Sequence, residues 1–392
     1  MNNKNQTIYI IDALRTPIGK LHGAFSHIRP DDLASLVINA LTQKNTFNKK
    51  EIDGIILGCA NQAGEDNRNI ARRVSLLAEL PYTATATTIN SLCSSGMEAI
   101  LSAIKNIALG DGHLYLAGGV ESMSRSPMIT SKIDQKTVDS LIGWRFVNPK
   151  MPSVCPPFSM AQTAELLAKN YAIPRIAQDT YAYQSRQKYQ VALEKAIWDA
   201  EILPIEDQKK KLWRSDEQHR LLSLDLLTKL PKLVANGNYI SAGNAARIGD
   251  GAALVALASE KYIQEHNIKP IAKIKSWASA SCHPSEMSLS AVVATQKALN
   301  KVSLQTQDLD WVEMSESFAV QTLACIEALQ LNPQKVNPNG GALTIGNPIA
   351  VSSARLVVTL AKEMERNKTI KNGLATTCAG LGTGAALILE SI

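Results

Sequence analysis

The sequence has no long apolar run, few aromatic residues and no pair of closely spaced cysteines. Of its 392 residues, 5% are aromatic. No stretch approaches the roughly 18 uninterrupted apolar residues of a membrane-spanning helix, so we predict no membrane span. The first residues, MNNKNQTIYIIDALRTP, lack a basic segment followed by an apolar one, so no signal peptide is expected.

The cysteines are scattered along the chain, and none has the spacing of a zinc ligand pair. In a long chain without a secretory signal we expect reduced thiols, no disulfide framework and no metal site. This pattern predicts a cytoplasmic protein. The six are Cys59, Cys93, Cys155, Cys282, Cys325 and Cys378.

Charge of either sign is also modest, with a formal net charge of +6. The one basic cluster, DQKKKLWR at residues 207–214, has acidic residues on both sides. That mixture favours a solvated surface over a nucleic-acid site, and no nucleic-acid motif accompanies it. We expect no nucleic-acid partner.

Short apolar strands alternate with helical patterns at both ends of the chain, which predicts an α/β fold with a helix-covered sheet. The first third has predicted strands at residues 8–12, 54–59, 85–90 and 113–119, and helices at 31–41, 70–80 and after Cys93. Asp31 or Asp32 is expected to cap the first helix. The last third has predicted strands at 272–279, 310–314, 373–378 and 384–390, and helices at 285–299, 318–329 and 348–365.

The similar length and element order of these two regions indicate an internal duplication. The stretch between them, from about Ser122 to Arg247, contains several prolines and long polar helices, and we interpret it as an inserted loop domain. The predicted boundaries are residues 1–121 for the first half, completed by about 248–270, then 122–247 for the loop domain and 271–392 for the second half.

Cys93 lies among small residues, in NSLCSSGMEAI, directly before a predicted helix. A lone cysteine commonly packs as a small apolar side chain. At a helix N-terminus it can instead be a nucleophile, because the free N–H groups lower the pKa of the thiol. Cys378 lies on a second small-residue turn, in TTCAGLGTGAALILE, where a ligand or another backbone segment can approach closely.

Taken together, these motifs resemble the thiolase family almost from end to end. The resemblance rests on IIDALRTPIGK, NSLCSSGMEAI, LAGGVESMSRSPM, MAQTAELLA, NPNGG and CAGLGTGAA, in that order. It implies two similar β-α-β-α-β-α-β-β halves in a five-layered α-β-α-β-α core, plus the loop domain, assembled as a homodimer or homotetramer. It also implies acyl transfer between coenzyme A (CoA), as substrate or product, and a cysteine, without a permanently bound cofactor.

The resemblance assigns Cys93 as the nucleophile that carries the acyl group. Cys378 would be the acid or base that moves a proton at the second substrate, because such steps need a nearby group of matched pKa. Substrate and CoA contacts are expected from a further set of positions. These are Met160, Arg220, Ala246, Arg247, Met287, Phe318 and Gly380.

The chain departs from the family pattern inside the expected site. The family's Gly-His-Pro is here Gly346-Asn347-Pro348, and asparagine can donate a hydrogen bond but cannot take a proton. The family's asparagine in NEAFA is replaced by Ser315, which can still hold a water. Ala246 and Arg247 replace a serine and a glycine that line the family's pantetheine channel.

Three functions therefore stay open on the sequence. The first is a working thiolase that acts on 3-oxoacyl-CoA with weakened or altered activation. The second is another thioester acyl transfer or hydrolysis. The third is a catalytically silent binding protein or partner subunit with a thiolase fold. Retention of both Cys93 and Cys378 favours the first two.

Overall fold

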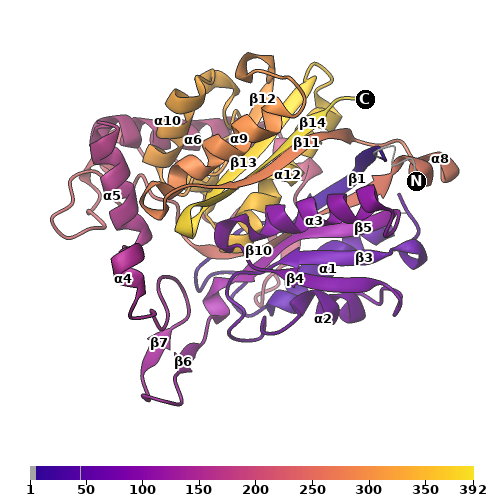
Figure 1. Cartoon of the computed structure of the whole chain (residues 1–392), viewed down its shortest axis with the longest axis horizontal. Coiled ribbons are helices and arrows are strands. Elements are labelled where there is room, and N and C mark those ends of the chain that lie inside the picture. Colours follow the sequence, from indigo (N-terminus) through magenta and orange to yellow (C-terminus); the bar gives the residue numbers. More distant parts are fainter. Residues whose placement is uncertain (1–5, 45) are drawn as a thin grey trace.

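The computed structural model describes residues 6–44 and 46–392 and is built on one mixed sheet. The strands lie in the order β12-β13-β14-β11-β1-β10-β5-β3-β4, with β2 beside β10 (Figure 1). Their bounds are β1 (Ile8–Arg15), β2 (Gly19–Lys20), β3 (Gly54–Gly58), β4 (Thr85–Ile89), β5 (Leu114–Ser122), β10 (Gly249–Ser259), β11 (Ala272–Ser281), β12 (Trp311–Met314), β13 (Asn372–Ala379) and β14 (Thr383–Glu390).

The sheet consists of two halves with the same topology, which confirms the predicted duplication. In the first half, β10 is antiparallel to both β1 and β5, and β5 and β4 run parallel to β3. In the second half, β14 is antiparallel to both β11 and β13, and β13 is parallel to β12. The counterpart of β4 is reduced to one parallel bridge between Val312 and Val336. The halves join where Tyr9 and Ile10 pair with Lys273 and Ala272.

The two halves of the sheet form two layers and the helices form the other three, so the predicted five-layered arrangement is present. α1 and α2 cover the outer face of the first half, α9 and α10 cover that of the second, and α3 and α12 lie between the halves (Figure 1). Their bounds are α1 (Pro30–Gln43), α2 (Ile70–Leu77), α3 (Ser95–Leu109), α9 (Ser290–Asn300), α10 (Ala319–Leu329) and α12 (Ile349–Arg366).

The sequence of α3 explains its central position. Met97, Ile100, Leu101 and Ile104 recur at helical spacing and are all fully buried. The helix ends at Gly110, whose φ of 87° lies in the left-handed region that favours glycine. α12 is buried along almost its whole length, as expected of a helix that contacts a sheet on each side.

The first turn of α12 lies directly against α3 and β5. A Cβ atom on Gly96 or on Gly119 would come within 2.3 Å of the carbonyl oxygen of Ala350. The backbone N–H of Ala350 donates to the carboxylate of Glu121 at 3.1 Å. Absence of a side chain at both glycines therefore allows the helix to start at this place.

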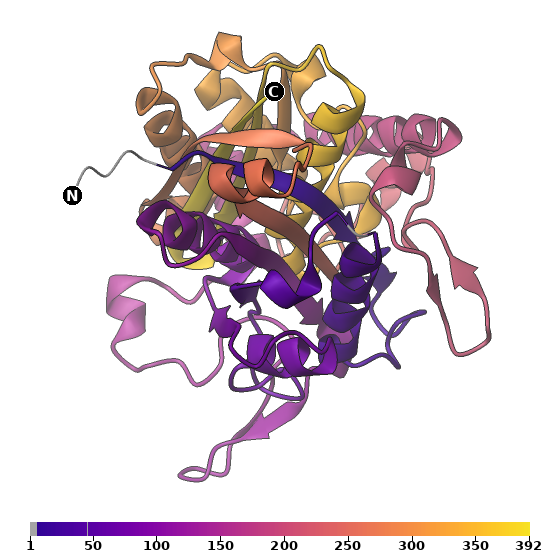
Figure 2. The ribbon, with the colours of Figure 1, turned by 90° about the vertical axis from the view of Figure 1, so that its right-hand side faces the viewer.

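The segment between β5 and β10 adds peripheral hairpins and helices. The hairpins β6 (Met128–Thr130)–β7 (Thr137–Asp139) and β8 (Ile205–Glu206)–β9 (Leu212–Trp213) extend from the body (Figure 2). The helices are α4 (Met151–Val154), α5 (Met160–Asn170), α6 (Arg175–Glu194) and α7 (Leu224–Lys229), while α8 (Glu260–Glu265) and α11 (Ala342–Ile345) lie outside this segment. Over residues 6–44 and 46–392, no helix combines the length and apolar character needed to cross a membrane.

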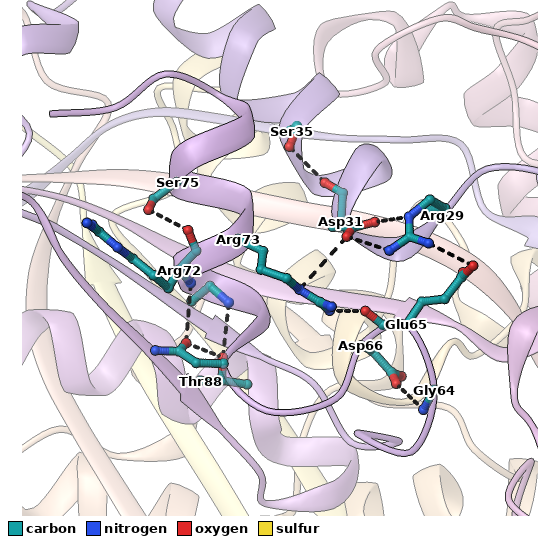
Figure 3. Close-up of polar contacts among 12 residues, drawn as sticks. Arg29, Asp31, Ser35, Gly64, Glu65, Asp66, Arg72, Arg73, Ser75 and Thr88 are labelled. Carbon is teal, nitrogen blue, oxygen red and sulfur yellow. Dashed lines mark hydrogen bonds and ion pairs between the residues drawn. The ribbon is translucent and has the colours of Figure 1, made fainter. Parts of the chain in front are cut away.

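The start of α1 differs from the prediction that Asp31 or Asp32 caps it. The N-cap is Arg29, which makes no side-chain capping bond. The carboxylate of Asp31 instead accepts from the guanidinium of Arg29 at 2.9 and 3.0 Å, and the Nε of Arg73 lies 3.9 Å away. Arg29 and Arg73 also bind Glu65, in the loop after β3 (Figure 3). Because α1 begins at Pro30, Asp31 is the second residue of the helix and not its N-cap, and its carboxylate binds these guanidinium groups instead.

The buried carboxylate of Asp31 provides a test of this network. Asp31→Ala should lower the free energy of unfolding by about 1–3 kcal/mol, because the two arginines lose their acceptor. The exposed neighbour Asp32 is the matched control, since both residues lie in the first turn and interact similarly with the helix dipole. Thermal unfolding midpoints measure the difference, and an equal loss in both variants would contradict the network's role.

Candidate active site

A tight turn presents Cys93 just before α3. Cys93 lies in the short helix η2 (Leu92–Ser94), and Leu92 has a φ of 51°, in the left-handed region. The hydroxyl of Ser95 donates to the carbonyl of Leu92 at 2.6 Å and accepts from the N–H of Ser91 at 2.9 Å. The side-chain oxygen of Asn90 accepts a hydrogen bond from the N–H of Leu92 at 3.1 Å. These bonds stabilise a backbone conformation that an ordinary residue rarely adopts.

Burial controls the acidity of the Cys93 thiol. It raises the pKa of Cys93 to about 11, and the negative charge of Glu121 acts in the same direction. A hydrogen bond from the backbone N–H of Gly380 opposes this shift and lowers the pKa. The expectation that the helix N-terminus gives a low pKa is therefore wrong, because loss of hydration outweighs the N–H groups.

Cys378 lies at the end of β13, close to Cys93. Burial raises its pKa well above the ordinary value, and the charges of Cys325 and Cys93 raise it further. The hydroxyl of Ser315 lies 4.0 Å from the Cys378 sulfur and accepts from the Cys378 N–H at 3.4 Å. The structure thus brings Cys93, Cys378 and Ser315 together, with both thiols protonated near neutral pH.

Gln321 forms hydrogen bonds to the segment that carries Ser315. Gln321 was not among the residues expected from the sequence. Its side-chain amide donates to the carbonyl and hydroxyl oxygens of Ser315 at 2.8 and 3.2 Å. Its carbonyl oxygen accepts from the N–H of Ser317 at 3.1 Å. The signal in the sequence that could have identified Gln321 was a glutamine within the largely apolar run FAVQTLACIEAL.

Asn347 lies on the turn before α12, and its amide has a defined orientation. Its N–H donates to the carbonyl of Arg247 at 2.6 Å. Its side-chain oxygen accepts from the Ser352 hydroxyl, and its side-chain nitrogen lies 3.4 Å from the hydroxyl of Ser317. Across the described part of the chain, no hydrogen bond joins Asn347 to Cys93. The orientation leaves the amide nitrogen as a donor near the Ser315–Ser317 segment.

Four of the predicted substrate contacts lie on or near the Gly380 turn, Gly380 itself among them. A Cβ atom on Gly380 would lie 3.9 Å from the sulfur of Met160. Met160 also packs against the apolar cluster that contains the buried Phe318. Met287 is buried in the short helix η5 (Pro284–Leu289), which packs against both α5 and η8 (Gly380–Gly382).

The other three predicted contacts lie along a second strip. Ala246 donates its N–H to the carbonyl of Ser317 at 3.0 Å, so this strip runs beside the Ser315–Ser317 segment. The guanidinium of Arg247 donates to the carbonyl of Gln218 at 2.5 Å. Arg220 is exposed, and its charge lowers the pKa of Arg247 in addition to the larger effect of burial.

Glu121 is a second residue that sequence reasoning missed. Its buried carboxylate accepts backbone N–H groups from Ala60, Asn61 and Ala350 at 3.0–3.1 Å. Burial raises its pKa to about 7, against the lowering effect of these bonds. Ligand atoms of Glu121, Cys59 and Asp66 lie within 4.8 Å of one another. Because Glu121 already binds three backbone amides, we assign it a structural role.

Comparison with known proteins gives matches along the whole chain. Family models described as the thiolase N-terminal and C-terminal domains match residues 8–261 and 268–391. The β-ketoadipyl-CoA thiolase of Pseudomonas aeruginosa is 41% identical over 99% of this chain and 100% of its own length. The 3-oxoadipyl-CoA/3-oxo-5,6-dehydrosuberyl-CoA thiolase of Escherichia coli is 41% identical, with 98% and 99% covered.

Solved structures agree with these matches. The structure of human mitochondrial 3-ketoacyl-CoA thiolase in complex with CoA has a TM-score of 0.91 at 32% identity, covering 99% of this chain and 98% of that one. The acetyl-CoA acetyltransferase of Bacillus anthracis has a TM-score of 0.92 at 33% identity, with both chains fully covered.

The raised pKa of Cys93 predicts how its reactivity depends on pH. Alkylation of Cys93 by iodoacetamide should become about tenfold faster per pH unit between pH 7 and pH 9, because only the thiolate reacts and its fraction rises tenfold per unit below the pKa. Peptide mass spectrometry measures the rate, and Cys93→Ala identifies the peptide. A rate that is already constant above pH 7 would contradict control by burial.

Proposed function

Because this chain belongs to the thiolase family and is an acyltransferase, we propose that it cleaves or forms 3-oxoacyl-CoA through an acyl thioester on Cys93. The names of its relatives make 3-oxoadipyl-CoA the first substrate to test. The main support for the proposal is that two thiols from different halves of the sheet lie close together, because η2, which carries Cys93, packs against β13, which carries Cys378. The backbone N–H of Gly380 also donates toward Cys93.

In the cleavage direction the reaction begins at Cys93. The Cys93 thiolate attacks the 3-oxo carbon, and the bond between carbons 2 and 3 of the acyl chain breaks. The electron pair stays on carbon 2, which takes a proton from Cys378, and acetyl-CoA leaves. The thiol of free CoA then attacks the acyl-Cys93 thioester, releases the shortened acyl-CoA and returns its proton to Cys378.

In this proposal Asn347 acts as a hydrogen-bond donor rather than as a base. Its side-chain oxygen is occupied by Ser352, which leaves the nitrogen to donate to a developing oxyanion. Asparagine does not accept the thiol proton, so formation of the thiolate depends on pH. The hydroxyl of Ser315, which accepts from Gln321, lies 4.0 Å from the Cys378 sulfur and would position a water there.

The proposal extends to the surroundings of the enzyme. CoA is a substrate or product and not a resident cofactor, and all six cysteines are free thiols, consistent with a cytoplasmic protein. We expect a homodimer or homotetramer from the family resemblance.

The covalent step can be tested directly. Incubation with acetyl-CoA or with medium-chain acyl-CoA esters should add the mass of one acyl group to the intact protein, and the Cys93→Ala variant should show no adduct. An adduct that survives this substitution would contradict Cys93 as the nucleophile. Absence of any adduct, together with no loss of 3-oxoadipyl-CoA on addition of CoA, would support a catalytically silent protein instead.

The Asn347 position provides a second test. Asn347→His should speed acylation at least tenfold near pH 7 and flatten its pH dependence, because a positioned base is worth about 10²–10⁴-fold. Asn347→Ala should slow acylation about 10²-fold through loss of an oxyanion donor. Stopped-flow release of CoA measures both rates. A histidine variant no faster than the wild type would favour a different acyl-transfer chemistry built around asparagine.

A further inference from the structure

We propose that a groove between α6 and α10 is a second binding site, for a small amphipathic carboxylate: an apolar chain or ring that carries one carboxylate group. The apolar part lies between the two helices, and the carboxylate binds the ammonium of Lys188. The inference goes beyond the proposed function, because none of the residues that line this groove takes part in the acyl transfer described above.

The groove lies where α6 packs against α10 and is bordered at one end by η7 (Pro333–Lys335) (Figure 1). Its volume is about 570 Å³, within the range of small-molecule sites. Along α6 it extends from Ile176 to Lys188, a length of roughly 18 Å at about 1.5 Å per residue. These dimensions suit an elongated small molecule that lies along the helix.

Apolar side chains from both helices line the groove. On α6, Ala177 and Tyr181 are four residues apart and share one helix face. On α10, Leu323 and Ile326 are three residues apart and share the face opposite them. Removal of apolar surface from water favours binding, so this part of the groove accommodates the apolar part of the ligand.

Lys188 supplies the charge. It is the one charged residue among the described residues that line the groove. Its ammonium is partly buried and donates to the carbonyl of Val336 at 3.0 Å. In the described part of the chain, no carboxylate lies within ion-pair distance of this ammonium. Because an ammonium has three N–H donors, two remain for a ligand.

The electrostatic surroundings of Lys188 favour an added negative charge. Burial lowers the pKa of Lys188, and the more distant charges of Glu316 and Glu313 oppose this shift. A partly desolvated cation gains from an anion in direct contact with it. One carboxylate matches one ammonium, whereas a phosphate monoester carries close to two charges near neutral pH.

The rim of the groove favours a small molecule over a protein partner. A stable protein interface buries about 800 Å² on each partner. Among the described lining residues, Ile176 is the one large apolar side chain that is exposed, and the neighbouring Gln184 and Gln187 are exposed and polar. Apolar walls with few polar groups at the edge are typical of a small-molecule pocket.

The groove lies on the far side of the residues that position the Ser315 segment. The ring of Tyr181 lines the groove, and its hydroxyl donates to Glu316 at 2.8 Å. The helix that supplies Leu323 also carries Gln321, whose amide binds Ser315. A ligand in the groove therefore contacts both helices that support the candidate active site, without contacting Ser315 itself.

Equilibrium dialysis with radiolabelled decanoate and 1-decanol tests the role of the charge. One decanoate should bind per chain, and decanol, which has the same chain without a charge, should bind at least tenfold more weakly. Lys188→Gln should weaken decanoate binding at least tenfold and leave decanol binding nearly unchanged. Lys195→Gln, which changes an exposed lysine at the C-terminal end of α6, is the matched control and should bind decanoate as the wild type does.

A groove-filling variant tests the location. Thr180 lines the groove from α6 and is partly exposed, so Thr180→Trp should fill the groove and abolish binding of both ligands while the thermal unfolding midpoint stays unchanged. If this variant does not fold, Gln184→Trp, at an exposed position one turn further along α6, takes its place.

Three results would overturn the inference: no decanoate binding to the wild type, decanoate binding that is insensitive to Lys188→Gln, or binding that survives filling of the groove. A groove-filling variant whose oligomeric state changes in sedimentation experiments would also overturn it, because a second copy of the chain would then cover the groove. None of these results affects the acyl adduct on Cys93, so failure here is distinguishable from failure of the proposed function.

Discussion

The structure depends on the close contact between Ala350, at the start of α12, and the bare α-carbons of Gly96 and Gly119. The carbonyl of Ala350 occupies the space that a Cβ atom on either glycine would need, and its N–H is bound by Glu121. Cys93 precedes Gly96 by three residues, and Asn347 precedes Ala350 by three. One backbone contact between α3 and α12 therefore sets the relative positions of the turns that carry these two side chains.

Buried polar groups fix the remaining segments around this contact. Glu316 links the segment beside Cys378 to α6 and to the Asn337 loop. Arg15, at the end of β1, is fully buried and pairs with Glu201 at 2.5 Å and with Asp216 at 2.7 Å. Such pairs add little net stability compared with apolar packing, but leaving either partner alone is costly. They therefore favour one arrangement of the segment between β5 and β10 over others.

Periodicity and motif order were sufficient to predict most of the fold and the central residues of the candidate site. Strands and helices of both halves follow from local apolar spacing, which is a property of neighbouring residues. Features that depend on distant partners were not accessible. Asp31 was expected to cap α1, but the helix begins one residue earlier, at Pro30, and the Asp31 carboxylate binds Arg29 and Arg73. The pKa of Cys93 was expected to fall, but burial by other segments raises it. Gln321 was missed for another reason: its partners, Ser315 and Ser317, lie only six and four residues away, but the turn that brings them together does not follow from apolar spacing.

The order of the strands also has a consequence for synthesis on the ribosome. β10 separates β1 from β5 in the sheet, yet β5 ends at Ser122 and β10 begins at Gly249. Translation at about 5–20 residues per second needs roughly 6–25 s to cover that interval. During this time the edges of β1 and β5 that pair with β10 in the finished sheet have no partner. The inner face of the first half stays uncovered still longer, because α12 is synthesised later. Binding by a chaperone in this interval would protect surfaces that the finished protein buries completely.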